Sequence, residues 1–234
     1  MHRRISIYPV LVFLIMFLSG TPAFAGVVIT GTRIVYPGNE KEVTVKVDND
    51  GEQPVLVQIW SDRGNADATP DKASAPFLVT PPVKRINGGK GQMFRLIYTG
   101  ENLPVNKESL FWLNVLEIPA EKKGSTDKLK MAFRSRLKIF FRPAGLQGSA
   151  EQAFKTLTWK KVKGGIEGDN PTPYFVSVAS IAEDKDGRSI LNHGGMIAPG
   201  SKAFFPMKNS LNTIYPSFIN DFGGLVTLPQ PVVY

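Results

Sequence analysis

The stretch from Leu129 to Phe141 alternates between apolar and basic residues and constrains the fold more than any other part of the chain. Successive side chains of a β-strand point to opposite faces, so we predict a long strand with one apolar and one basic face. Around a helix axis the same apolar residues would scatter. We hypothesise that part of the apolar row has no partner within this chain and serves a guest. The basic residues between the apolar ones are Lys130, Arg134, Arg136 and Lys138.

Short alternating runs separated by turn residues continue along the chain from Gly26, and no helical periodicity is found. About seven runs precede Pro143, a spacing typical of a β-sandwich. A second, less regular set follows. We therefore predict an all-β protein of two sandwich domains, residues 26–143 and 144–234. Because the chain stops soon after Leu228, we expect the last strand of the second domain to be truncated or differently built.

Two local predictions concern the first domain. The Asn49-Asp50-Gly51 turn joins two valine-rich runs, a pattern that indicates a β-hairpin. The run from Val27 to Tyr36 is predicted as one strand, with Arg33 in the middle of an apolar row. That arginine is either an inward charge that protects a sheet edge from aggregation or an anchor for a carboxylate. Residues 61–76 are a polar loop for which the sequence suggests no role.

Residues 1–25 have the pattern of a secretory signal peptide. A basic start, His2-Arg3-Arg4, precedes an apolar run from Val10 to Leu18 and a small-residue cleavage site at Ala23-Phe24-Ala25. We expect export and removal of this segment, which lowers the formal net charge of +8 to about +6. No later run is apolar enough to span a bilayer, so membrane insertion is not expected.

The composition argues against most catalytic chemistry. The chain has no cysteine, which excludes disulfides and Cys-ligated metals, and we predict no metal or other cofactor. After the leader, His193 is the single histidine, and no G-x-S-x-G motif accompanies it. We interpret it as a solvated loop residue and predict no catalytic residue, although a two-carboxylate glycosidase site would leave no spacing signature. Basic residues spread along strands, in an exported protein, do not favour nucleic acid.

Residues 103–120, with the sequence LPVNKESLFWLNVLEIPA, resemble the signature of periplasmic pilus-assembly chaperones, the PapD-like family. The resemblance covers essentially the whole chain after residue 25. It implies two immunoglobulin-like domains in a boomerang arrangement with a cleft between them. Matching pieces occur in order at Thr32–Tyr36, Thr80–Val83, Lys138–Pro143, Asn170–Tyr174 and Ile219–Gly224.

The resemblance implies a partner, a pilus subunit that lacks the last strand of its own sandwich. The chaperone lends an edge strand to that subunit and delivers it to an outer-membrane usher. Arg33 and Lys138 match a cleft pair that holds the C-terminal carboxylate of the subunit. The strand-lending positions are Leu129, Met131 and Phe133, and a structural charge network between the domains corresponds to Glu108, Arg142 and Asp221.

The Glu121–Asp127 loop is short, which together with the absence of cysteine resembles the short-loop branch that serves rod-like pili. Whether the free protein covers its edge by self-association stays open. Two alternatives are an exported adhesion or carbohydrate-binding sandwich module and a secreted glycosidase accessory domain. A sugar-binding protein needs neither an apolar edge row nor an arginine–lysine pair, so the family resemblance is the favoured interpretation.

Overall fold

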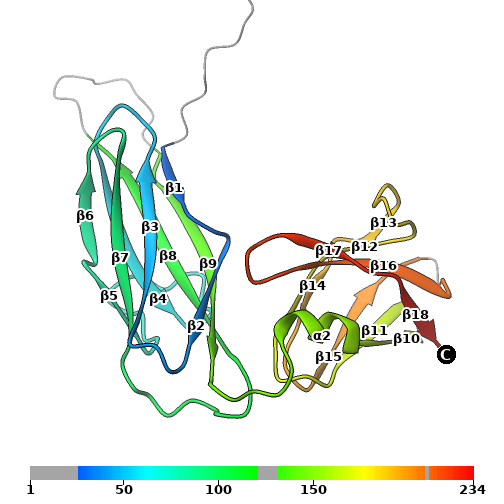
Figure 1. Cartoon of the computed structure of the whole chain (residues 1–234). Coiled ribbons are helices and arrows are strands. Elements are labelled where there is room, and N and C mark those ends of the chain that lie inside the picture. Colours follow the sequence, from blue (N-terminus) through cyan, green and yellow to red (C-terminus); the bar gives the residue numbers. More distant parts are fainter. Residues whose placement is uncertain (1–25, 121–130, 209–210) are drawn as a thin grey trace, which may run out of the picture.

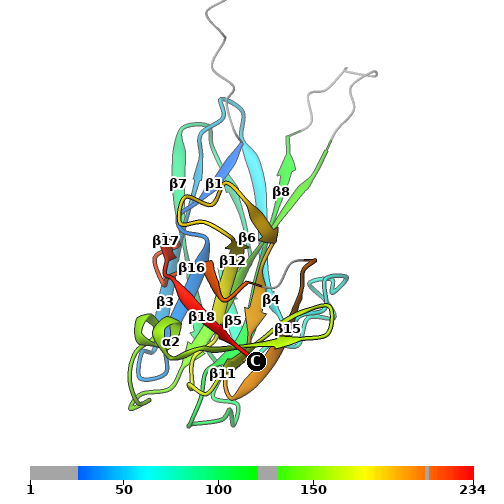
Figure 2. The same ribbon diagram turned by 90° about the vertical axis from the view of Figure 1, so that its right-hand side faces the viewer.

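The computed structural model describes residues 26–120, 131–208 and 211–234 and shows two β-sandwiches that meet at an elbow (Figure 1). The predicted leader, the Glu121–Asp127 loop and Leu129 lie outside the described residues. The all-β prediction with two sandwich domains is confirmed. Figure 2 shows the molecule from the side, with the second sandwich in front of the lower part of the first.

The first sandwich packs two sheets around one apolar core, in the orders β1-β3-β7-β5 and β2-β9-β8-β4-β6. All of its pairs are antiparallel except β2 with β9, which is parallel. Tyr36, Val57, Phe94 and Ile139 are completely buried in this core. The strands are β1 (Val27–Ile29), β2 (Arg33–Pro37), β3 (Glu42–Asn49), β4 (Val55–Asp62), β5 (Phe77–Thr80), β6 (Val83–Ile86), β7 (Lys90–Tyr98), β8 (Ser109–Pro119) and β9 (Phe133–Arg142).

The prediction of one strand from Val27 to Tyr36 is wrong, because the run divides between the two sheets. β1 pairs with β3 in one sheet, and β2 pairs with β9 in the other. The change of sheet occurs at Gly31, whose φ of 91° lies in the left-handed region that glycine adopts without strain. The core-facing residues are Val27 and Ile29 in β1 but Ile34 and Tyr36 in β2, so the alternation shifts by one residue. Valines on the opposite face of both halves hide this shift in the sequence.

The predicted hairpin at Asn49-Asp50-Gly51 is also wrong. β3 and β4 are not paired and belong to different sheets. The buried side chain of Asn49 accepts a hydrogen bond from the Gly51 N–H and donates to the carbonyls of Gln53 and Ile86. The turn therefore carries the chain from one sheet to the other across the core.

The second sandwich contains a short helix, α2 (Ala150–Thr156), that the sequence analysis missed. Ser149 caps it by accepting a hydrogen bond from the Gln152 N–H, and seven residues are too few for helical periodicity to stand out. The strands are β10 (Thr158–Val162), β11 (Gly165–Asn170), β12 (Val176–Ala182), β13 (Ile190–Asn192), β14 (Gly195–Ile197), β15 (Ser201–Pro206), β16 (Thr213–Ile219), β17 (Leu225–Thr227) and β18 (Gln230–Val233).

The strands of the second sandwich follow the order β13-β12-β16-β18-β10-β11-β15, with β14 beside β12 and β17 beside β16. The last strand of the second domain, for which we expected truncation or a different construction, is β18, and its four residues pair with both β10 and β16. Trp159, Ile166, Ile214 and Phe218 are buried at the centre of this core. The described part of the chain has no helix with the length and apolarity needed to cross a bilayer.

Candidate functional site

Strand β9 is paired along only half of one side. Its pairing with β8 runs from Phe133 to Phe141, whereas its pairing with β2 begins at Lys138. β1, which precedes β2 in the chain, pairs with β3 in the other sheet (Figure 1). Within the described ranges, residues 133–137 therefore have one backbone edge without a strand partner. Such an edge is a template for pairing with another chain.

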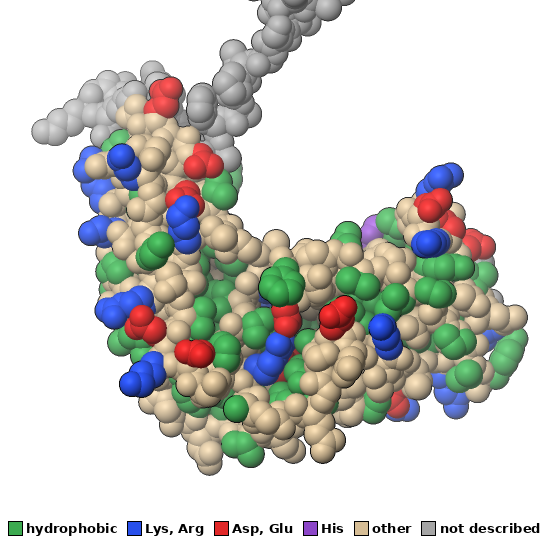
Figure 3. All heavy atoms as spheres, viewed as in Figure 1, with side chains coloured by type: hydrophobic (Ala, Val, Ile, Leu, Met, Phe, Trp, Pro, Cys, Tyr) green, Lys and Arg blue, Asp and Glu red, His purple; other side chains and the backbone are tan. Residues whose placement is uncertain are grey.

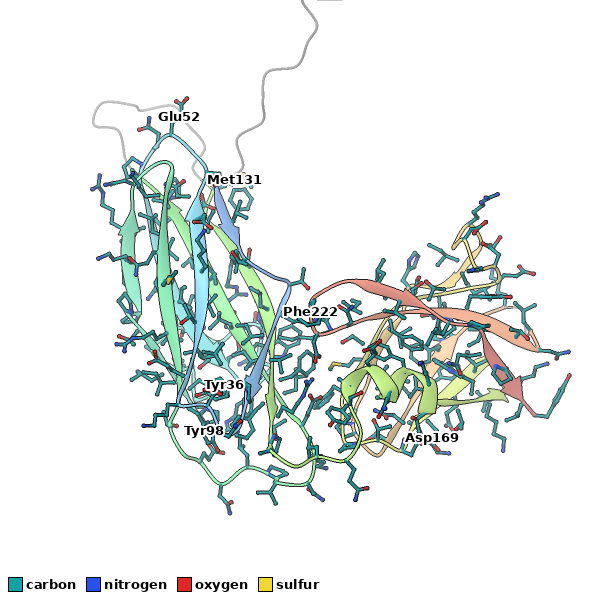
Figure 4. The ribbon with its side chains drawn as sticks, in the orientation of Figure 1. Tyr36, Glu52, Tyr98, Met131, Asp169 and Phe222 are labelled. Atoms are coloured by element: carbon teal, nitrogen blue, oxygen red, sulfur yellow. The ribbon has the colours of Figure 1, made fainter. Side chains whose placement is uncertain are left out.

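The apolar row of β9 divides at the same place. Leu137 and Ile139 are buried in the core, whereas Met131 and Phe133 are 55% and 58% exposed. Figure 4 shows Met131 at the end of the first sandwich far from the elbow. Of the predicted strand-lending residues, Met131 lies two residues before the start of β9 and Phe133 begins it, while Leu129 lies outside the described residues.

Arg33 and Lys138 are direct neighbours in the parallel register of β2 and β9. Arg33 lies on the face away from the first core and donates from Nη1 to the carbonyl of Ile219 in the second sandwich, at 3.0 Å. Its Nε is buried and finds no acceptor among the described residues. The guanidinium carbon lies 5.8 Å from the ring centroid of Phe140. Arg33 is thus directed at the junction rather than into its own core.

The electrostatics of this pair favour an anion. Burial lowers the pKa of Lys138, and the charge of Arg33 lowers it further. Burial also lowers the pKa of Arg33, with Asp221 acting in the opposite direction. Neither cation forms an ion pair with a carboxylate in the described part of the chain. Two half-buried like charges destabilise each other, and Asp221 offsets this only in part at Arg33. A bound carboxylate would relieve the remaining repulsion.

A second charge cluster joins the two sandwiches at the elbow. Arg142 donates from Nε to Glu108 at 2.6 Å and from Nη1 and Nη2 to Asp221 at 2.7 and 3.0 Å. Glu108 also accepts the Phe175 N–H at 2.7 Å. Glu108 lies just before β8 and Asp221 lies in the turn between β16 and β17, so the cluster contacts both sandwiches. Phe140 packs on Phe175 beside it, with ring centroids 5.8 Å apart.

Within this cluster the charges are well compensated. Burial raises the pKa of the Glu108 carboxyl, while its contacts with Arg142 and the Phe175 N–H oppose that change. Burial by itself would lower the pKa of Arg142, but its hydrogen bonds to Asp221 and its pairing with Glu108 raise it above the ordinary value. The structure thus brings together the three residues predicted from the resemblance, separately from the Arg33–Lys138 pair.

The concave surface between the two arms is visible in Figure 3. Phe222 lies where the β16–β17 turn approaches the first sandwich and is 94% exposed (Figure 4). The sequence analysis included this residue in the Ile219–Gly224 piece but assigned it no role. His193 is exposed between β13 and β14, and no cluster of potential metal ligands occurs among the described residues.

Two family models together match most of the chain. The pili and flagellar-assembly chaperone, PapD N-terminal domain, matches residues 26–147, and the pili assembly chaperone PapD, C-terminal domain, matches residues 152–230. The chain is 41% identical over 219 residues to the chaperone protein FimB/FhaD of Bordetella pertussis, with 90% of each chain covered.

Solved structures show the same architecture. The crystal structure of the Pseudomonas aeruginosa CupB2 chaperone matches with a TM-score of 0.77 and 39% identity, covering 88% of this chain and 100% of that one. A chain of the Salmonella enterica SafA pilin–SafB chaperone complex matches with a TM-score of 0.76 and 28% identity, covering 90% and 97%. The chain therefore belongs to the PapD-like family of pilus-assembly chaperones.

Proposed function

We propose that this protein binds pilus subunits in the periplasm by lending them the free edge of β9, and that it delivers them to an outer-membrane usher. The observation that carries this proposal is the half-paired strand, whose unpaired backbone edge coincides with an exposed apolar row. A subunit that lacks a strand would pair with this edge by β-augmentation. Met131 and Phe133 would then enter the groove left by the missing strand.

The cation pair supplies the end point of that interaction. Arg33 and Lys138 lie where the free edge ends and β2 begins to pair with β9. An extended subunit strand running along residues 133–137 would therefore bring its terminus close to the two cations. A C-terminal carboxylate there would gain charge-assisted hydrogen bonds, and its position would fix the register of the added strand.

The remaining parts of the proposal rest on the sequence and the family. The pattern of residues 1–25 supports export, and the Glu108–Arg142–Asp221 cluster would keep the two arms at the angle that binding requires. The Glu121–Asp127 loop lies outside the described residues, so membership in the short-loop branch stays a prediction. Self-association of the free protein through its edge is equally untested.

Replacing Phe133 with Glu tests the lending of the strand. Because Phe133 is exposed in the free protein, the variant should fold normally, but a carboxylate would enter the apolar groove of the subunit. We expect subunit binding to weaken by about 1.5–3 kcal/mol or more, the value of burying one large apolar side chain. The measurement is the yield of the binary complex after co-expression with an exported pilus subunit.

Met93→Glu is the matched control, since Met93 is a similarly exposed apolar residue on β7 in the other sheet of the same sandwich. It should bind subunit as the unmodified protein does. Equal complex yields from Phe133→Glu and Met93→Glu would contradict strand lending. Unfolding of Phe133→Glu in the absence of subunit would instead show that Phe133 belongs to the chaperone's own core.

A further inference from the structure

Asp62, the last residue of β4, is a buried carboxylate that the proposed function does not use. It is 1% exposed. Arg136 donates from Nη2 to both of its oxygens at 2.8 Å, and Asn114 donates from Nδ2 at 2.6 Å. The Gly64 N–H donates to it at 2.6 Å. A charged group so completely buried and so fully hydrogen-bonded holds its donors in fixed positions.

The ion pair joins strands that are not neighbours. β8 lies between β4 and β9, with Trp112 opposite Asp62 on one side and Asn114 opposite Arg136 on the other. The side chain of Arg136 therefore crosses β8 to reach Asp62. On its way the guanidinium carbon lies 4.7 Å from the ring centroid of Trp112. The Arg136–Asp62 ion pair thus connects the free half of β9 with β4 in the interior of the sheet.

The loop that follows Asp62 makes a second contact with β9. Arg134 donates from Nη2 to the carbonyl of Ala66 at 2.6 Å. Trp60 of β4 stabilises the loop, because its indole N–H donates to the carbonyl of Ala68 at 3.2 Å. The sequence analysis found no role for this loop. In the structure its first residues contact both arginines of the free half of β9.

These contacts lie where β9 most needs support. Residues 133–137 have backbone pairing on one side only, and Met131 and Phe133 contribute little burial. A strand end with few buried contacts opens locally at low free-energy cost. An edge that must accept a partner strand binds better when it is already extended, because less conformational entropy is lost on binding.

The contacts of Arg136 also extend to the Arg33–Lys138 pair. The Lys138 ammonium lies 5.7 Å from the ring centroid of Trp112, the same ring on which Arg136 packs. Arg136 and Lys138 occupy the same face of β9. An Arg136 side chain that is held in place therefore also holds the Trp112 ring, on which Lys138 packs.

We propose that Asp62 is a positioning residue that, with Arg136, clamps the free half of β9 in the extended conformation in which it receives a subunit. The proposal rests on the proposed function. It assigns residues 62–68 the role of keeping the free edge of β9 extended before a subunit binds. Asp62 itself need not touch the subunit. Its effect on binding would be transmitted through Arg136 and Arg134.

Amide hydrogen exchange of the free protein tests the clamp without any subunit. Asp62→Asn removes the charge while keeping the size of the side chain, and the double variant Asp62→Asn/Arg136→Met also removes the cation that would otherwise be left unpaired. We expect the amides of residues 133–137 that pair with β8 to exchange about tenfold faster in both variants. Amides in the β3–β7 pair should exchange at the unmodified rate.

Glu101→Gln is the control, because it breaks the exposed ion pair that Arg63, in the same loop, makes with Glu101 and leaves Asp62 untouched. It should exchange as the unmodified protein does. If Asp62→Asn does not fold, the double variant decides, since replacing a buried ion pair as a whole is often neutral for stability. Unmodified exchange at residues 133–137 in the double variant would overturn the clamp.

Subunit binding tests the positioning role. With Arg33 and Lys138 intact, the double variant should form the binary complex about tenfold more slowly than Glu101→Gln. Faster exchange at residues 133–137 combined with an unchanged association rate would overturn the positioning role. If the unmodified protein binds no subunit, the proposed function fails, and the exchange measurement still decides whether the clamp exists.

Discussion

Lys138 and Arg142 lie on the same face of β9, yet their surroundings are opposite. Arg142 has two carboxylate partners, and they raise its pKa. Lys138 has another cation, Arg33, as its register neighbour, and its pKa is lowered. β9 therefore carries a compensated cation that joins the two domains and, towards its free half, a second cation that lies beside Arg33 of β2 and forms no ion pair among the described residues. The difference teaches that a cation with no carboxylate partner among the described residues is the better candidate for binding a guest.

The largest effect is expected where the charges are compensated. Arg142→Ala leaves the buried Glu108 carboxylate without its cation. Removing one partner of a buried ion pair typically costs about 3–5 kcal/mol. We expect the two sandwiches to lose their fixed angle and to unfold in separate steps during chemical denaturation. Small-angle scattering of the free protein would show a broader distribution of shapes.

Arg95→Ala is the control for that experiment, because its ion pair with Glu42 is exposed and worth less than about 1 kcal/mol. The comparison fails if Arg142→Ala unfolds with the same midpoint as Arg95→Ala and keeps the shape of the unmodified protein.

A smaller effect on stability and a large effect on binding are expected at the uncompensated pair. Lys138→Ala removes a repelled charge, so the free protein should keep its stability. Arg33→Ala loses a hydrogen bond to the Ile219 carbonyl, worth about 1 kcal/mol. Both variants should lose about 2–5 kcal/mol of subunit binding, as expected when one partner of a buried charge pair is truncated.

The measurement is again recovery of the binary complex, with Lys84→Ala as control, since Lys84 is an exposed lysine on β6 of the same sheet. Complex recovered in unmodified yield from both Arg33→Ala and Lys138→Ala would remove the carboxylate anchor from the proposal.

The smallest effect concerns pH. Between the lowered pKa of Lys138 in the folded protein and its ordinary value of 10.5, the unfolded chain binds more protons than the folded one. The free energy of unfolding should therefore rise with pH in that window, relative to Lys138→Met. The difference should be a few tenths of a kcal/mol, because water screens a half-exposed group. Parallel stability profiles of the two proteins across alkaline pH would contradict the electrostatic description of the pair.

Subunit binding should show the opposite trend in the same window. Deprotonated Lys138 cannot pair with a carboxylate, so the complex should weaken as pH rises, and Lys138→Met should not share this dependence. A wild-type affinity that is constant with pH would indicate that Lys138 does not contact the subunit as a cation.

Several features of the fold were predictable because they depend on local patterns. Period-two alternation identified β3, β4 and β9, and the spacing of such runs predicted two sandwich domains. The resemblance carried by residues 103–120 added the boomerang arrangement of the two. The helix α2 was missed because seven residues, about two turns, are too few for helical periodicity to stand out from a short alternating run. The error at Asn49 has a different cause, since an Asn-Asp-Gly sequence favours a turn but does not specify which sheet receives the next strand.

The candidate site was predicted unevenly. Arg33 and Lys138 could be named from the resemblance, but the residues alone left Arg33 undecided between edge protection and an anchor. In the structure the Arg33 side chain points to the junction between the two domains, where it contacts the Ile219 carbonyl, and this direction favours the anchor. Asp62 could not be recognised in the sequence, because a carboxylate at the start of a polar stretch looks solvated until Arg136 of β9 is seen to reach it.

By itself, the sequence determined that the chain is built from strands, because the alternation of side chains along each strand is a local property of the backbone. It also determined which residues are cations. Only the tertiary structure decided that the chain changes sheet at Gly31, so that β2 pairs with half of β9 and the other half keeps an open edge. The physical reason is that strand pairing and charge compensation join residues distant in sequence, and a cation is free or compensated according to what the fold brings beside it.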